Sequence, residues 1–73
     1  MVVPFHGSLF GQLAQATGKT FALQVCRSAA GYYVGTHDEH GAPYSRESAE
    51  YWPTITAAET ALRRGRWTQR LEP

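Results

Sequence analysis

Residues 20–27 alternate large apolar side chains with smaller or polar ones, and this pattern restricts the possible folds more than any other feature. Successive side chains of a strand point to opposite faces, so the alternation predicts a half-buried β-strand. Residues 28–31 are few enough for a hairpin turn, and residues 32–37 have the aromatic and β-branched bias of a second strand. One face of the first strand is expected to carry Phe21, Leu23 and Val25, and the other Ala22, Gln24 and Cys26. The pattern therefore predicts an antiparallel hairpin.

A turn and a third strand are predicted after this hairpin. Asp38 can open a turn through its side-chain oxygen, and Gly41 can adopt the positive φ that such a turn requires. A strand is expected near residues 43–48. Pro43 places that strand at an edge, or marks its first residue, because proline cannot donate to the ladder.

A short helix is predicted before the hairpin, at residues 8–17. Ser8 is the expected N-cap, because its hydroxyl can accept a hydrogen bond from a free amide of the first turn. Gly18 follows at the position where a left-handed residue ends a helix. Leu9, Leu13 and Ala16 would share one face of this helix.

The last helix is predicted from a capping box. Thr56 and Glu59 have the spacing at which a threonine hydroxyl and a glutamate carboxylate each satisfy a backbone donor of the first turn. Gly65 is the expected stop, and two arginines precede it where the helix dipole favours cations. The apolar stripe of this helix is expected to contain Ala57, Ala58, Ala61 and Leu62.

The order helix, strand, strand, strand, helix predicts one α+β domain over residues 1–73. We expect a three-stranded antiparallel meander, with the N-terminal and C-terminal helices packed on one face. A chain of 73 residues buries only about 60% of its unfolded surface, so its stability margin is small. Such domains often depend on covalent staples or on self-association.

The single cysteine excludes an internal disulfide and a site built from several thiolates. An unpaired Cys26 fits a reducing cytosol, and inert burial is its expected state. No apolar run approaches the roughly 20 residues of a membrane span. The first six residues lack the basic and apolar regions of a secretory signal. We therefore expect a cytoplasmic protein without membrane association.

Two arrangements that suggest catalysis or nucleotide binding fail on spacing or context. Residues 18–20, Gly-Lys-Thr, look like the end of a phosphate-binding loop, but the glycine that this motif needs at position 13 is Leu13. Ser45 and His40 suggest a nucleophile with a base, but there is no glycine-flanked nucleophile elbow. We therefore predict no enzyme activity, no catalytic residue and no cofactor.

Residues 37–40, His-Asp-Glu-His, contain four potential metal ligands in a row. Neighbouring side chains diverge in a strand that enters a turn, so a solvated polar turn is the favoured interpretation and no metal is predicted. The alternative is a surface site in which His37 and His40 meet across the turn, with His6 as a third ligand.

Charge is distributed unevenly although the net charge is only +1. Residues 36–62 carry five acidic side chains against one arginine, and residues 63–73 carry four arginines against one glutamate. Such asymmetry can mark a charged partner. It can equally mean that the two parts neutralise each other in the fold.

Aromatic and arginine side chains supply the candidate partner-binding residues, because tyrosine, tryptophan and arginine are enriched at binding hot spots. The alternative for Tyr33, Tyr51 and Trp52 is that they complete a core poor in leucine and isoleucine. Residues 66–70 are expected to be exposed, with the alternative that they return across the sheet and Trp67 covers the core. The predicted partner-binding residues are Tyr32, Tyr33, Arg46, Arg64, Arg66, Trp67 and Arg70.

Several motifs between residues 31 and 71 resemble small orphan accessory proteins of bacterial plasmids and integrative elements. They are Gly31-Tyr-Tyr-Val-Gly-Thr, Gly41-x-Pro-Tyr-Ser-Arg-Glu-Ser, Glu50-Tyr-Trp-Pro-Thr, Ala57-Ala-Glu-x-Ala-Leu and Gly65-x-Trp-Thr-Gln-Arg. That group has no established activity, so the resemblance implies a mobile-element context and assigns no residue a role.

The leading hypothesis is a non-enzymatic protein-binding module that inhibits a host defence complex, such as a CRISPR effector. Its partner would be a protein complex of the host or of the element. The alternative is a nucleic-acid-binding accessory protein, in which C-terminal arginines contact phosphates and Trp67 stacks on a base. A homodimer is compatible with both, because the sheet should have an open edge.

Overall fold

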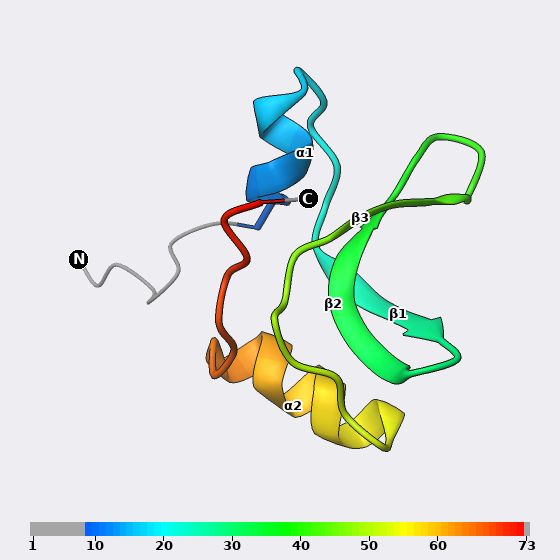
Figure 1. Cartoon of the computed structure of the whole chain (residues 1–73), viewed down its shortest axis with the longest axis vertical. Coiled ribbons are helices and arrows are strands. Elements are labelled where there is room, and N and C mark those ends of the chain that lie inside the picture. Colours follow the sequence, from blue (N-terminus) through cyan, green and yellow to red (C-terminus); the bar gives the residue numbers. More distant parts are fainter. Residues whose placement is uncertain (1–8, 73) are drawn as a thin grey trace.

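The structure is a computed structural model that describes residues 9–72. Figure 1 shows the order of its elements along the chain. The predicted order of a helix, three strands and a helix is confirmed, and the α+β class is confirmed with it. The elements are α1 (Gln12–Ala16), β1 (Gln24–Ser28), β2 (Gly31–His37), β3 (Pro43–Arg46) and α2 (Ile55–Arg64).

The three strands form one antiparallel sheet in the order β1-β2-β3, which is the predicted meander. Ser28 pairs with Gly31, so β1 and β2 are joined by the two-residue turn Ala29–Ala30. The polar turn before β3 is also confirmed. Oδ1 of Asp38 accepts hydrogen bonds from the N–H groups of His40 and Ala42, both at 2.9 Å.

β1 starts later than predicted, at Gln24 instead of residue 20. The preceding residues 21–23 pair instead with residues 9–11. The N–H of Gly11 donates to the carbonyl of Phe21, and the N–H of Leu23 donates to the carbonyl of Leu9, both at 2.9 Å. The alternating pattern therefore continues through residues 20–23, but this part of it pairs with a different segment.

β3 ends at Arg46, two residues before the predicted end. The N–H groups of Glu47 and Ser48 both donate to the carbonyl of Val34 at 2.9 Å, so the ladder is interrupted there. Pairing resumes at Trp52, which exchanges two hydrogen bonds with Tyr32. This interruption turns the side chain of Glu47 away from the regular strand and into the molecule.

The stop of α2 is predicted correctly and its start is not. Gly65 has a left-handed conformation with φ 66°, and the N–H of Arg66 donates to the carbonyl of Ala61 at 2.8 Å. At the other end the N-cap is Thr54, whose hydroxyl accepts from the N–H of Ala57 at 3.1 Å. The predicted capping box at Thr56 is therefore wrong, because the N-cap lies two residues earlier and the helix begins at Ile55.

α1 is half the predicted length, because it begins at Gln12. Its N-cap is Gly11, which has no side chain to accept a hydrogen bond. The predicted N-cap, Ser8, lies outside the described residues. The predicted stop is confirmed, since Gly18 has φ 87° and the N–H of Lys19 donates to the carbonyl of Ala14 at 3.1 Å.

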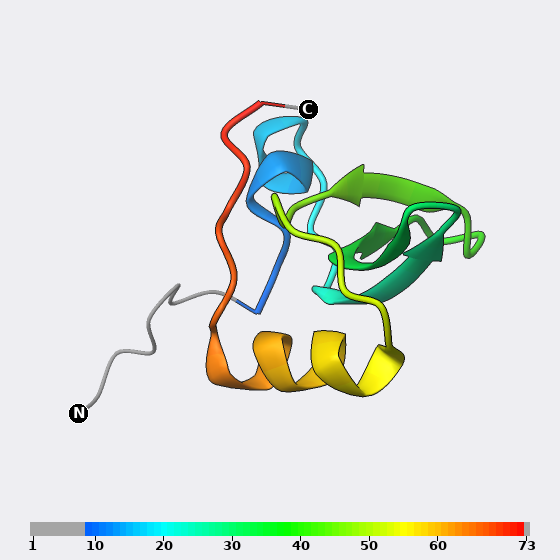
Figure 2. The same cartoon turned by 60° about the horizontal axis from the view of Figure 1, so that its bottom comes forward.

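Figure 2 shows α2 beneath the sheet and α1 to the left of the sheet. α2 contacts β1 and β2, whereas α1 contacts β3. The packing of both helices on one face remains a prediction. The C-terminal segment runs from the end of α2 towards α1 (Figure 1), and Gln69 forms a bridge with Ser48. No helix within residues 9–72 is long and apolar enough to span a membrane. The buried apolar core includes Ala14, Cys26, Tyr33, Val34, Ala58, Ala61 and Trp67.

Candidate protein-binding face

A fully buried carboxylate, that of Glu47, lies where α1, β3 and the C-terminal segment meet. Its Oε1 accepts from the N–H of Leu13 at 2.9 Å and from Nε2 of Gln69 at 2.8 Å. Its Oε2 accepts from the N–H of Ala14 at 3.2 Å and from the hydroxyl of Ser45 at 2.6 Å. We call these five residues the Glu47 network.

The Glu47 network is structural, because both carboxylate oxygens are occupied by donors of the same chain. Burial alone would raise the pKa of Glu47. The hydrogen bonds from Leu13, Ser45, Gln69 and Ala14 outweigh burial and hold that pKa below its usual value. The carboxylate is therefore ionised at neutral pH, and it satisfies the first amides of α1, where the helix dipole favours a negative charge.

The Glu47 network also positions the C-terminal segment beside residues 46–50. The N–H of Arg70 donates to the carbonyl of Glu47 at 2.7 Å, and the N–H of Ala49 donates to the carbonyl of Thr68 at 2.8 Å. The carboxylate of Glu50 accepts from the N–H of Thr68 at 2.9 Å. This pairing brings two arginines from distant parts of the sequence, Arg46 and Arg70, side by side, with Nη1 of Arg70 3.5 Å from the carbonyl of Arg46.

Tyr44, on β3, has a partly exposed ring that is held in place from two sides. The ring meets that of Phe21 edge-on, with centroids 4.9 Å apart. Its hydroxyl shares a hydrogen bond of 2.6 Å with the hydroxyl of Thr17, at the end of α1. The side chain remains 38% exposed, so its position is fixed although one surface is free to bind.

Tyr51 is held in a similar way and remains 39% exposed. The guanidinium carbon of Arg46 lies 4.6 Å from the centroid of its ring, and the ring of Tyr33 meets it edge-on at 5.9 Å. A cation over an aromatic ring is attracted by the ring's quadrupole, which restricts both side chains. We call Tyr44, Arg46, Tyr51 and Arg70 the Tyr–Arg face.

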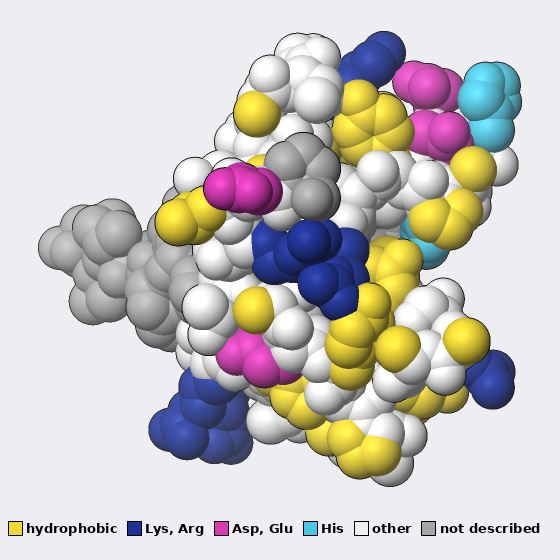
Figure 3. Space-filling model, in the orientation of Figure 1, with side chains coloured by type: hydrophobic (Ala, Val, Ile, Leu, Met, Phe, Trp, Pro, Cys, Tyr) yellow, Lys and Arg dark blue, Asp and Glu magenta, His cyan; other side chains and the backbone are white. Residues whose placement is uncertain are grey.

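A hollow of about 320 Å³ lies on this part of the surface, between α1, β3 and the C-terminal segment. Figure 3 shows Lys and Arg side chains gathered near the middle of the view, with hydrophobic side chains beside and below them. The lining contains two guanidinium groups, which can donate hydrogen bonds to carboxylates and carbonyls, and three hydroxyls that are hydrogen-bonded within the chain. The lining residues are Leu13, Thr17, Tyr44, Ser45, Arg46 and Arg70.

No family model, no curated protein and no solved structure matches this chain. The resemblance to accessory proteins of mobile elements therefore remains a prediction. The residues of the face carry the functional inference by themselves.

Two predicted binding residues, Tyr33 and Trp67, are buried. They are 7% and 5% exposed, so neither presents a ring to a partner. Trp67 lies within the segment that pairs with residues 48–50. This agrees with the alternative, in which the chain returns and the tryptophan covers the core. The expectation that Trp67 is exposed is thus wrong. The exposure expected for its neighbour is found at Arg66.

The other predicted residues lie in three places. Arg46 and Arg70 belong to the Tyr–Arg face. Tyr32 is half-buried on β2, with the guanidinium of Arg27 5.7 Å from its ring. Arg64 and Arg66 are exposed at the C-terminal end of α2. The seven residues predicted to bind a partner therefore do not form one surface.

Two tyrosines of the face, Tyr44 and Tyr51, are not among the predicted binding residues, and a core position was the alternative for Tyr51. Both rings lie close in sequence to the predicted Arg46. Trp52, for which a core position was also considered, is partly buried. No spacing rule indicates which ring stays exposed, since the interruption of the ladder after Arg46 decides it.

Ser45 and Cys26, two potential nucleophiles, are both engaged within the fold. The hydroxyl of Ser45 donates to Glu47 and shares a 2.6 Å hydrogen bond with Thr36. Burial raises the pKa of Cys26, which keeps the group a neutral thiol. Within residues 9–72, no three His, Cys, Asp or Glu side chains are grouped as metal ligands. The proposed third ligand, His6, lies outside the described residues.

Proposed function

We propose that this domain is a protein-binding module that uses the Tyr–Arg face. One observation carries the proposal: Tyr44, Arg46 and Arg70 line one hollow, Arg46 also lies over the ring of Tyr51, and contacts within the chain restrain these side chains. Binding costs entropy when flexible side chains are immobilised, so rings and guanidinium groups that are already restrained favour a tight interface. Tyrosine and arginine are also the side chains most enriched at hot spots.

The chemistry of the face indicates the kind of protein surface that fits it. Arg46 and Arg70 offer several N–H donors in planar arrays, which match carboxylates. The tyrosine rings offer apolar area beside these donors. The acidic groups nearest in sequence are engaged elsewhere, since Glu47 holds α1 and Glu50 binds the N–H of Thr68. An acidic partner surface with apolar side chains at its centre is therefore the proposed complement.

The biological setting rests on the resemblance to accessory proteins of mobile elements. It supports a partner in the cytoplasm, within a protein complex of the host or of the element. Inhibition of a defence complex, such as a CRISPR effector, is the specific form of the proposal. Blocking such a complex requires only binding, which the Tyr–Arg face would supply.

Affinity capture with matched variants tests the proposal. The wild-type domain and an Arg64→Ala control should recover the same protein from lysate of the native host. Arg46→Ala and Tyr51→Ala should recover it at least about tenfold less well, a loss of about 1.4 kcal/mol or more. Circular dichroism would confirm that each variant folds. Calorimetry with the purified partner then gives the dissociation constants.

Equal recovery by Arg46→Ala and the wild type would refute the face, and recovery of no protein would refute the module. The alternative of nucleic-acid binding is tested in parallel with short single- and double-stranded DNA at low salt. The burial of Trp67 removes the base-stacking contact which that alternative needs. Binding of DNA, lost on Arg64→Ala and Arg66→Ala but not on Arg46→Ala, would establish it instead.

A further inference from the structure

β1 is an edge strand, and the hydrogen bonds of β2 show which of its backbone groups point outward. Tyr32, which pairs with Arg27, exchanges both of its backbone hydrogen bonds with Trp52, on the other side of β2. Antiparallel pairs alternate between hydrogen-bonded and non-bonded, so Tyr32 and Arg27 form a non-bonded pair. The N–H and carbonyl of Arg27 therefore face the open edge.

Val25 has the same orientation. Its partner on β2 is Val34, whose N–H donates to the hydroxyl of Ser48 at 3.0 Å and whose carbonyl accepts from Glu47. Both groups of Val34 thus point away from β1, and those of Val25 face the open edge. Within residues 9–72, no backbone group of the chain pairs with Val25 or Arg27 on that side.

This open edge is short, because it is closed at both ends. At one end the N–H of Leu23 is bound by the carbonyl of Leu9. At the other end Ser28 leads into the turn to β2. An incoming strand can therefore use Val25 and Arg27 and no further residue of β1. Open edges of this kind are the places at which sheets add strands.

We propose that the edge is occupied by a second copy of this chain, whose β1 pairs antiparallel to the first about a two-fold axis at Cys26. Each Val25 then pairs with the partner's Arg27, and each pair exchanges two hydrogen bonds. An axis at Val25 would require the N–H of Leu23, which is already bound. An axis at Arg27 would require residues of the turn. The register at Cys26 alone uses all of the open groups.

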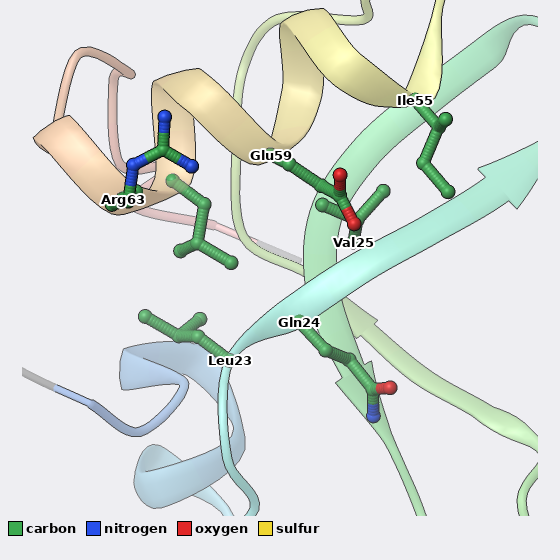
Figure 4. A pocket seen from close by; sticks show the side chains of 7 residues that line it. Leu23, Gln24, Val25, Ile55, Glu59 and Arg63 are labelled. Carbon is green, nitrogen blue, oxygen red and sulfur yellow. The ribbon is translucent and has the colours of Figure 1, made fainter.

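Charge complementarity on the α2 side of the edge favours a second copy over an unrelated strand. A groove of about 640 Å³ lies between α2 and β1. Figure 4 shows the carboxylate of Glu59 reaching down beside Val25 on its wall. Side chains at i and i+2 of a strand share a face, so Arg27 lies on the same side as Val25. In the proposed register the partner's Arg27 comes opposite Val25 and next to Glu59.

The two-fold axis repeats this contact, so both copies gain an Arg27–Glu59 pair between subunits. Ile55, at the start of α2 and lining the same groove, is 48% exposed and gains apolar cover. The two three-stranded sheets become one continuous sheet of six strands. Self-association is a common source of stability for domains of this size. The Tyr–Arg face takes no part in this contact, so the dimer does not depend on the proposed function.

Charge reversal with restoration tests the dimer. Sedimentation and light scattering over a concentration series give the dissociation constant of the wild type. Arg27→Glu and Glu59→Arg should each raise it by at least about tenfold, because each places like charges together twice. The double variant should return to within about threefold of the wild type. Arg64→Glu is the matched control, since it changes the net charge as Arg27→Glu does at an exposed site of the same helix as Glu59.

Hydrogen exchange locates the contact independently of charge. The amides of Val25 and Arg27 should exchange quickly at low concentration and become protected as the dimer forms. Those of Gln24 and Cys26 should be protected throughout, because they face β2. A monomer at millimolar concentration overturns the proposal. So does a dimer without protection at Val25 and Arg27, or protection that does not depend on concentration, which would mean that the chain covers its own edge.

Discussion

α2 carries its start and stop signals within its own sequence. α1 instead depends on Glu47, which binds the N–H of Leu13 from 34 positions further along the chain. Thr54 caps α2 and Gly65 ends it, and buried Ala58 and Ala61 face the core. α1 has five residues, a glycine at its N-cap and no acidic residue in its first turn. Its amides are bound by Glu47.

This difference shows two ways of stabilising a helix in a small domain. An isolated helix of five residues has no stability of its own, because nucleation is unfavourable and few bonds follow it. Glu47 supplies fixed acceptors for α1, and the same carboxylate binds β3 and the C-terminal segment through Ser45 and Gln69. α1 is therefore stable only when the sheet and the C-terminal segment are already in place.

Removal of the Glu47 carboxylate is the most severe test of this dependence. Glu47→Ala leaves buried donors without acceptors and should lower the free energy of unfolding by about 3–5 kcal/mol. At about 0.05–0.15 kcal/mol per residue, this is a large part of the total stability of such a chain. Urea unfolding measures the loss, and Glu47→Gln, which keeps the shape, should lose less. A loss below 1 kcal/mol for Glu47→Ala would contradict the structural role of the network.

Acid should weaken the same network. Hydrogen bonding holds the pKa of Glu47 below its ordinary value of about 4.3 in the unfolded chain. The stabilisation is therefore complete above that value and is lost as the pH falls through the folded-state pKa. Urea unfolding of the wild type and Glu47→Gln between pH 7 and pH 2 should show their stabilities converging in acid. Asp38, whose pKa is also lowered by the N–H groups of Ala42 and His40, affects both proteins equally. A constant difference would contradict this assignment.

The N-cap glycine of α1 offers a smaller perturbation of the same site. Gly11 has φ −68°, so alanine is allowed there by its backbone. A Cβ would however lie 2.6 Å from Oε2 of Glu47 and 2.6 Å from Cγ2 of Thr36. Gly11→Ala should therefore cost about 1–3 kcal/mol through overpacking. It should also shift the amide resonance of Leu13. Gly18→Ala is the contrasting variant, because its Cβ meets nothing within 4 Å and its cost comes only from the φ of 87°.

The sequence predicts those parts of the fold whose signals are local. The alternation of residues 20–27, the turn at residues 38–41 and the stops at Gly18 and Gly65 each depend on neighbours within a few positions, and each is found. The start of α1, the end of β3 and the burial of Trp67 depend on contacts that cross the chain, all of them around the segment that follows β3. Only tertiary pairing decides those features.

The same limit applies to the Tyr–Arg face. Residue type indicates that Arg46 and Arg70 reach the surface, because arginine is seldom buried, and both are partly exposed. It cannot show that two residues 24 positions apart lie side by side. Nor can it separate the partly exposed ring of Tyr51 from the buried ring of Tyr33, since the residue type is the same at both positions. The two rings meet edge-on with centroids 5.9 Å apart, a contact that only the fold determines.

The smallest expected effect separates the cap of α2 that the sequence suggests from the cap that the structure shows. Thr54→Ala removes the acceptor of the Ala57 amide and should cost about 1 kcal/mol. Thr56→Ala should be neutral or stabilise by up to about 0.5 kcal/mol, because Thr56 is an exposed position inside the helix, where alanine has the higher propensity. Thermal unfolding of the two variants distinguishes these effects, since each changes one threonine of the same short segment. The reverse order would restore the capping box at Thr56 and Glu59, and α2 would then begin where the sequence predicts. The structural order would show that even in the helix with the strongest local signal, the choice between two nearby caps is made by the chain that leads into it, where Trp52 exchanges two hydrogen bonds with Tyr32.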